Sequence, residues 1–242
     1  MLLAVTLFLF VGLITAAQLP SSIEKCSFSD PALNQCLTKR ARLFAPTMIK
    51  GIPELGLEPM DPLALNDLQS TAGTFSLKSK NVIVKGMRNM EIKELGFDWK
   101  AKTGIMHLYG NVTFLSDYQT VGRLLLLPFS GQGKLSVKIR GLDVHTKYKL
   151  ELYKDDKGIE HVKSSDQRPV STYENVKIHI NNVLGTGGGG LLDDAVNQVL
   201  NDNWRDLMVD LGPPFVQAVF DKVELLVNKF YSQIPFSEMT LP

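Results

Sequence analysis

Apolar and polar positions divide the chain into three kinds of pattern, and the first is helical. Between residues 33 and 48, apolar residues recur at roughly the spacing of one helical face. Asp30-Pro31 is a good helix start, because Asp caps the first turn and Pro fits the first helical position, and Gly51-Ile52-Pro53 stops the run. We therefore predict a short amphipathic helix, followed by a proline-punctuated segment from Pro53 to Pro62. The apolar positions are Leu33, Leu37, Phe44 and Met48.

The second pattern, from residue 73 to residue 184, is alternation. It contains about seven strand-like runs separated by Gly, Asn and Asp, which is typical of an antiparallel meander. In the run 133–140, Leu135, Val137 and Ile139 share one face, so one side of the sheet meets water and the other does not. The stretch Val121–Phe129 is apolar on both faces, and we expect it to be covered on both sides.

The sequon Asn111-Val112-Thr113 helps to set the phase of one strand. A glycan on Asn111 must point outward, and successive side chains of a strand alternate between its faces. We therefore expect Asn111 to be glycosylated and its even-numbered neighbours to point inward. Those neighbours are Met106, Leu108, Val112 and Phe114.

The third pattern begins after Gly190, where the helical period returns. Pro213-Pro214 divides the region into two long amphipathic segments, whose apolar faces are offered to the sheet. The first stripe comprises Leu192, Val196, Val199, Leu200, Trp204, Leu207, Met208 and Leu211. The second comprises Phe215, Val219, Val223, Leu226 and Phe230.

The N-terminus predicts secretion. An apolar run from Leu2 to Ile14 precedes Thr15-Ala16-Ala17, whose small residues suit signal peptidase, so residues 1–17 are interpreted as a signal peptide. The alternative is an uncleaved anchor, but this run is shorter than the about 20 residues that cross a bilayer. Residues 18–242 then form a single extracellular domain, and no later segment is apolar enough for stable membrane insertion.

Charge and cysteine content narrow the choice of partners. Lys and Arg number 26 against 25 Asp and Glu, and no dense basic block occurs, so nucleic acid is a poor candidate partner. Cys26 and Cys36 are the only cysteines, and an oxidising compartment favours one disulfide between them over two free thiols.

Motifs for catalysis or cofactor binding are weak. Gly185-Thr-Gly187-Gly-Gly-Gly190 has dinucleotide-binding spacing, but a second parallel strand is missing, so a flexible strand-to-helix hinge is favoured. The chain has no Gly-x-Ser-x-Gly elbow. His107, His145, His161 and His179 fit no metal-ligand spacing, and the first two and the last fall on the face assigned to solvent. We expect no metal, no cofactor and no enzymatic activity.

The inward side chains are almost entirely apolar, with many Phe, Met, Leu and Ile. Such an inventory suits either a filled core or an apolar cavity, and the pattern alone does not separate the two.

Several motifs in order carry a resemblance to a known family. Cys26 to Cys36 with Asp30-Pro31-Ala32, Lys50 to Gly56 and Asp61-Pro62-Leu63 resemble the N-terminal signature of the takeout and juvenile hormone-binding protein family of insects. Leu200 to Trp204 and Phe230 to Pro235 resemble its C-terminal signature. The glycines at 187–190 depart from the family pattern, and the single disulfide places the chain closer to takeout-like members.

The resemblance implies an α+β fold of the tubular lipid-binding type. In it, a long C-terminal helix is wrapped by a strongly curved antiparallel sheet, with a hydrophobic tunnel between them. It also implies a monomeric carrier of a small extended hydrophobic ligand, such as a terpenoid, a juvenile hormone-like molecule or a fatty acid. The expected wall is Phe75, Ile83, Phe97, Trp99, Met106, Leu108, Phe114, Val137, Ile139, Tyr148, Leu150, Met208, Phe215, Val219 and Phe230.

The sequence is compatible with three other functions. They are lipid transfer or lipopolysaccharide binding by the same architecture, a lipid hydrolase without a familiar motif, and a protein-interaction module with a filled interior. The near-neutral net charge makes lipopolysaccharide binding less favourable, because anionic surfaces attract concentrated positive charge.

Overall fold

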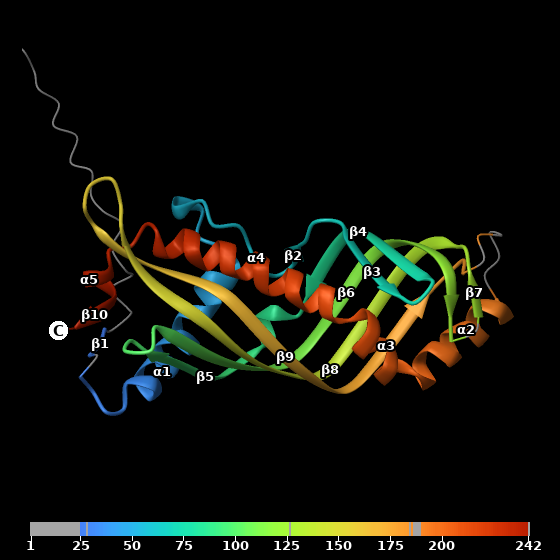
Figure 1. Cartoon of the computed structure of the whole chain (residues 1–242), viewed down its shortest axis with the longest axis horizontal. Helices are drawn as coiled ribbons and strands as arrows, with labels where there is room; N and C mark the ends of the chain where they lie inside the picture. The colour runs from blue at the N-terminus through green and yellow to red at the C-terminus, as the bar shows by residue number, and fades with distance from the viewer. Residues whose placement is uncertain (1–24, 28, 126, 184, 186–189, 242) are drawn as a thin grey trace, which may run out of the picture.

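The structure is a computed structural model that describes residues 25–241, apart from residues 28, 126, 184 and 186–189. The predicted signal peptide, residues 1–17, and most of the glycine run at 185–190 lie outside the described residues. An elongated antiparallel sheet curves around helices from the C-terminal part of the chain (Figure 1). The expected α+β architecture, with a strongly curved sheet wrapped around a C-terminal helix, is confirmed.

Eight strands make up the main sheet, in the order β2-β4-β6-β8-β9, with β3 paired to β4 and both β5 and β7 paired to β6. All of these pairings are antiparallel. The strands are β2 (Leu63–Ala64), β3 (Leu68–Ala72), β4 (Phe75–Lys85), β5 (Glu91–Asp98), β6 (Thr103–Leu124), β7 (Leu127–Phe129), β8 (Gln132–Lys154) and β9 (Glu160–Ile180).

Three of the strands are much longer than the runs expected from the sequence: β6, β8 and β9 span 22, 23 and 21 residues. The glycines and polar residues that interrupt the alternation lie within these strands. Register shifts occur between Gly110 and Val112 of β6 and between Lys147 and Lys149 of β8. Irregularities of this kind bend a strand and increase its twist, which lets such long strands curl around a central helix.

The apolar stretch Val121–Phe129 is a hairpin and not a buried strand. β6 ends at Leu124, Leu125 adopts a positive φ of 49°, and β7 returns from Leu127 to Phe129. Val121 is 62% exposed. The expectation that this stretch is covered on both sides is therefore wrong, because the turn reverses the chain within the apolar run.

Helices close the concave side of the sheet and its two ends. Figure 1 shows α4 running along the long axis of the molecule across the sheet, with α2 and α3 at one end and α1, α5 and the β1–β10 pair towards the other. α4 begins at Pro213, where a proline fits the first helical turn. The helices are α1 (Leu33–Lys50), α2 (Leu191–Asp202), α3 (Trp204–Leu211), α4 (Pro213–Tyr231) and α5 (Phe236–Met239), with short 3₁₀ turns at Pro53–Leu55 and Met87–Asn89.

The two ends of the described chain are joined. β1 (Cys26–Ser27) pairs in parallel with β10 (Thr240–Leu241), and Lys25 forms an ion pair of 3.2 Å with Glu238. The expected disulfide between Cys26 and Cys36 is present and ties β1 to the first turn of α1. Among the described residues, no helix is long and apolar enough to span a bilayer.

Candidate functional site

Three apolar cavities lie between the sheet and the helices. We name them by position: the α3 cavity, of about 100 Å³, the central cavity beneath α4, of about 260 Å³, and the α5 cavity, of about 200 Å³. β6, β8 and α4 run past more than one of them. The long strands and α4 therefore place the three cavities side by side along the molecule.

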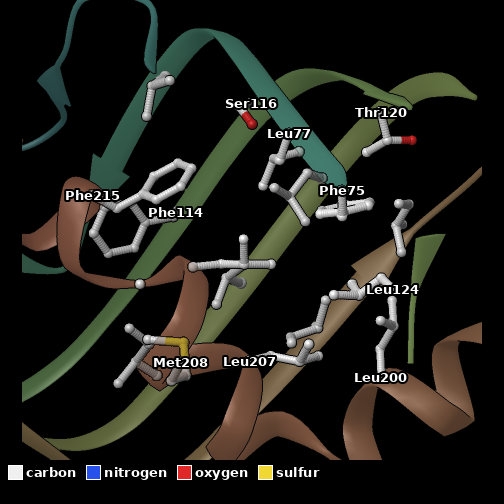
Figure 2. A pocket seen from close by; sticks show the side chains of 18 of the residues that line it. Phe75, Leu77, Phe114, Ser116, Thr120, Leu124, Leu200, Leu207, Met208 and Phe215 are labelled. Carbon is white, nitrogen blue, oxygen red and sulfur yellow. The ribbon is translucent and has the colours of Figure 1, made fainter. Parts of the chain in front are cut away.

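The α3 cavity is lined by β4, β6, β8 and β9 on the sheet side and by α2, α3 and the start of α4 on the helix side. Figure 2 shows its side chains converging from both layers, with Ser116 and Thr120 as labelled oxygen-bearing residues in a carbon-rich lining. The lining residues are Phe75, Leu77, Val82, Phe114, Ser116, Thr120, Leu124, Phe129, Leu135, Val137, Ile139, Ile178, Ile180, Leu200, Leu207, Met208, Leu211, Gly212, Phe215 and Val216.

The central cavity is lined only by apolar side chains, supplied by α1, α4, β4, β5, β6, β8 and the segments before β2 and after β4. Five methionines contribute to it: Met48, Met60, Met87, Met90 and Met106. Its other lining residues are Ala41, Phe44, Ala45, Ile49, Val84, Ile92, Leu108, Val112, Phe114, Ile139, Leu142, Val144, Val216, Val219, Phe220 and Val223.

The α5 cavity lies where α1, the end of α4 and α5 meet β5 and β9. Three polar side chains line it, those of Arg40, Trp99 and Tyr231, and burial raises the pKa of the Tyr231 hydroxyl to about 12. Tyr231 is therefore a neutral hydroxyl at physiological pH. The remaining lining residues are Cys26, Leu37, Ala41, Phe44, Met48, Leu95, Phe97, Val162, Val227, Phe230, Phe236 and Met239.

Neighbouring cavities share walls. Phe114, Ile139 and Val216 line both the α3 cavity and the central cavity. Ala41, Phe44 and Met48 line both the central cavity and the α5 cavity. A single side chain therefore borders both cavities at each of these residues. A rotamer change there, for example at Met48, alters the space between the two cavities.

The structure places most of the wall residues expected from the sequence around these cavities. Phe75, Val137, Met208 and Phe215 line the α3 cavity, Met106, Leu108 and Val219 line the central cavity, Phe97, Trp99 and Phe230 line the α5 cavity, and Phe114 and Ile139 lie at a junction. Contact of these side chains with a ligand stays a prediction.

Ile83 lies outside all three cavities. Counting by twos from Phe75 places it on the inner face, but the β4–β6 register shifts between Lys80 and Ile83, and Asn81 has a positive φ of 51°. The extra residue reverses the alternation, so Val82 and Val84 are the buried side chains.

Tyr148 and Leu150 point inward but line none of the three cavities. The Tyr148 ring lies over Gly104, where a Cβ would collide with it, and it contacts Phe97 edge to face with ring centroids 6.3 Å apart. Leu150 is 1% exposed and packs in the same cluster as Val162. Both side chains fill the layer behind the α5 cavity.

The wall expected from the sequence includes Met106 and Met208 but no residue of α1, and it omits the other methionines of the central cavity. The helical period places Phe44 and Met48 on the apolar face of a helix, but it does not show which cavity that face borders. Seven of the eight methionines line a cavity, and this clustering becomes visible only when distant segments are brought together.

The three cavities can bury an apolar molecule, but their linings supply few groups for acid-base catalysis. No histidine or carboxylate among the described residues lines any of them. Ser116 of the α3 cavity therefore has no general base beside it within that lining, and Thr120 Oγ1 lies 3.3 Å from the Gly131 carbonyl oxygen, to which it donates. The arrangement suits reversible binding of an apolar molecule.

Known proteins share this sequence pattern and fold. The circadian clock-controlled protein daywake of Drosophila melanogaster is 25% identical over 233 residues, covering 90% of this chain and 87% of daywake. The juvenile hormone-binding protein of Manduca sexta is 26% identical over 141 residues, covering 57% of this chain and 59% of that protein. The crystal structure of Epiphyas postvittana Takeout 1 matches with a TM-score of 0.83 and 26% identity, covering 91% of this chain and all of Takeout 1.

The sequence also matches the model of a whole protein family. The sequence model for haemolymph juvenile hormone binding protein (JHBP) matches residues 2–241, which is nearly the full length. The chain therefore belongs to the haemolymph juvenile hormone binding protein family.

Proposed function

We propose that the protein is a secreted carrier that holds an extended hydrophobic ligand in a tunnel formed by the α3, central and α5 cavities. The observation that carries the proposal is the pair of shared junctions, at Phe114, Ile139 and Val216 and at Ala41, Phe44 and Met48. A molecule longer than one cavity would reach the next when a shared apolar side chain turns aside.

The physical chemistry of the central cavity supports an oily occupant. An apolar cavity of about 150 Å³ can stay dry and accept benzene, because water needs polar partners that such a lining does not supply. The central cavity is larger, at about 260 Å³, and its lining side chains are all apolar. Burying about 15 carbons at about 0.8 kcal/mol each gives on the order of 12 kcal/mol before association costs. Micromolar to nanomolar affinity remains after those costs.

The methionine-rich wall supports loose selectivity. Methionine is unbranched and adaptable, so five methionines around one cavity let its shape follow ligands of different branching. Selection then depends on length and on the hydroxyls at the α3 end, which suits a terpenoid or fatty-acid-like molecule with one weakly polar group. The names of the hormone-binding relative and the family point to the same ligand class.

Secretion and glycosylation are part of the proposal. Cleavage after Ala17 would release a chain whose Asn111 is exposed on the outer face of β6. The Asn111 side-chain oxygen accepts a hydrogen bond from the Gly141 N–H at 2.8 Å, which leaves its amide nitrogen for a glycan. N-terminal sequencing and a glycosidase mass shift on protein secreted by insect cells test both expectations.

The carrier function is tested on protein purified after secretion. Solvent extraction and native mass spectrometry should reveal a co-purifying lipid, and a fluorescent fatty acid should bind and be displaced by unlabelled terpenoids. The displaced ligand should be chemically unchanged, as expected for a carrier that is not an enzyme. An extract without lipid, together with no binding of the fluorescent probe, would overturn the proposal.

A further inference from the structure

The outer face of the sheet carries a cluster that no cavity includes. His107 of β6 lies directly opposite His145 of β8 in the antiparallel register, and Asp143 precedes His145 by two residues on the same face. The three side chains differ in exposure: His107 is 23% exposed, Asp143 33% and His145 66%. The cluster therefore faces solvent, as alternation predicts, but is partly sheltered.

The three side chains converge on one point. The Nε2 atoms of His107 and His145 lie 3.0 Å and 3.1 Å from the same carboxylate oxygen, Oδ1 of Asp143. The two imidazole rings stack with centroids 3.9 Å apart. Among the residues that the structure describes, these three form a group of ligand-type side chains with donor atoms all within 4.8 Å of one another.

We propose that His107, Asp143 and His145 bind a divalent transition-metal ion, with Zn²⁺ as the representative. Two imidazole nitrogens and one carboxylate oxygen are a preferred ligand set for such ions, with metal–ligand bonds of about 2.0–2.2 Å. Around a tetrahedral ion, ligand atoms stand about 3.3 Å apart, close to the two nitrogen–oxygen distances observed. Water takes the open position on the solvent side.

The scaffold holds two of the ligands firmly and leaves the third adjustable. β6 and β8 are the two longest strands and pair along most of their length, so the backbone positions of all three residues are fixed and only the freedom of their side chains differs. Closing around an ion requires the stacked rings to splay so that both nitrogen lone pairs point inward. His145 is the most exposed of the three side chains and has room for that rotation.

Charged side chains of both signs surround the cluster, and they do not decide whether a cation binds. Glu91 of β5 lies close enough to His107 for their charges to interact, and Glu174 of β9 accepts a hydrogen bond of 2.7 Å from Tyr109, which stands opposite Asp143. Each of these carboxylates has a basic partner, since Lys93 is 2.6 Å from Glu91 and Arg140 is 3.9 Å from Glu174.

The proposed metal site is separate from the ligand cavities and independent of the carrier proposal. Met106, Leu108 and Val144 of the same strands line the central cavity, so the histidines and Asp143 occupy the opposite side of that wall. A variant at the metal site should leave binding of the fluorescent fatty acid unchanged. That result separates failure of one proposal from failure of the other.

The test uses full secreted protein without a histidine tag, because a tag would itself bind the metal. Titration calorimetry with ZnCl₂ should show equimolar binding, and Zn²⁺ should raise the thermal midpoint above that measured with a chelator. His107→Ala, Asp143→Asn and His145→Ala should each weaken Zn²⁺ binding by more than about 100-fold, since loss of outer-shell partners alone costs about 10–100-fold.

Three controls test whether the binding is specific and whether the variants fold. His179→Ala removes an exposed histidine elsewhere on β9 and should leave Zn²⁺ binding intact. Excess Mg²⁺ should not compete, because Mg²⁺ prefers all-oxygen ligands and this cluster has one carboxylate. Equal thermal midpoints of wild type and His145→Ala in chelator show that the variant folds. Absence of Zn²⁺ binding by the wild type, or binding retained by all three variants, would overturn the proposal.

Discussion

The side chain of Asn201 makes two hydrogen bonds with the backbone of Ile178, in the way that a neighbouring strand would. The Asn201 Nδ2 donates to the Ile178 carbonyl oxygen at 2.7 Å, and the Asn201 Oδ1 accepts from the Ile178 N–H at 2.9 Å. One helical turn earlier, Asn197 makes the same pair of bonds with Ile180, at 2.8 Å and 2.9 Å. Four residues of helix rise about 6 Å, close to the rise of two residues of strand. One face of α2 therefore supplies hydrogen bonds that an edge strand otherwise lacks.

Asn201→Ala should lower the free energy of unfolding by about 2 kcal/mol, because a partly buried backbone donor and acceptor of Ile178 lose their partners. Urea unfolding followed by circular dichroism measures the loss. The matched control is Asp202→Ala, which changes an exposed residue on the same helix and should shift the midpoint little. Equal losses in the two variants would show that the amide pairing with β9 contributes nothing.

Val216→Trp should divide the proposed tunnel. Val216 of α4 lies at the junction of the α3 and central cavities, so a larger ring there closes the path between them. We expect affinity for a long-chain fluorescent fatty acid to fall by about tenfold or more, and affinity for a short probe that fits one cavity to fall less. Leu225→Trp, on the exposed face of the same helix, should change neither. A similar loss for both chain lengths would argue against a continuous tunnel.

Ser116→Ala should affect ligands with a polar group and spare pure hydrocarbons. Ser116 is buried and is one of two residues with a side-chain hydroxyl in the α3 cavity. Losing one hydrogen bond of about 1.4 kcal/mol lowers affinity about tenfold. Competition assays with an alcohol and a hydrocarbon of equal length measure the difference. Ser136→Ala, on the outer face of β8, is the control, and an equal effect on both ligands in Ser116→Ala would contradict the predicted role.

Asp61→Asn should destabilise the protein in a pH-dependent way. The Asp61 carboxylate is buried and accepts hydrogen bonds from the Gly86 N–H, the Arg88 N–H and the Arg88 guanidinium, at 3.2 Å, 3.0 Å and 2.8 Å. Burial alone raises the pKa of Asp61, but the bonds from Arg88 and Gly86 outweigh it and hold the pKa below its ordinary value. The group therefore stabilises the fold above its unfolded pKa, and the contribution is lost as pH falls through the folded pKa.

At neutral pH we expect Asp61→Asn to cost about 2 kcal/mol, and the difference from wild type should shrink below about pH 4. Urea midpoints measured across acidic pH give the profile. Asp67→Asn changes an exposed carboxylate nearby and should track the wild type. A stability difference that stays constant down to low pH would mean that the charge of Asp61 is not responsible.

The sequence alone determined the type of most elements and, away from bulges and turns, which of their faces is buried. The spacing in Leu33–Lys50 indicated α1, and the alternation around Val137 indicated which face of β8 is buried. The cysteine pair indicated the disulfide, and ordered motifs indicated the family. The faces of α1 and β8 could be predicted because helical and strand periods are set by backbone geometry within a few residues.

Only the tertiary structure decided what lies behind each face. The bulge at Asn81 turned Ile83 outward, and Tyr148 filled space beside Gly104 instead of lining a cavity. The register of β6 against β8 brought His107 to His145 and Asp143, which no spacing along the chain indicates. Whether an apolar interior is filled or hollow depends on the separation between sheet and helices. That separation is set by packing among residues far apart in sequence, so a period along the chain carries no information about it.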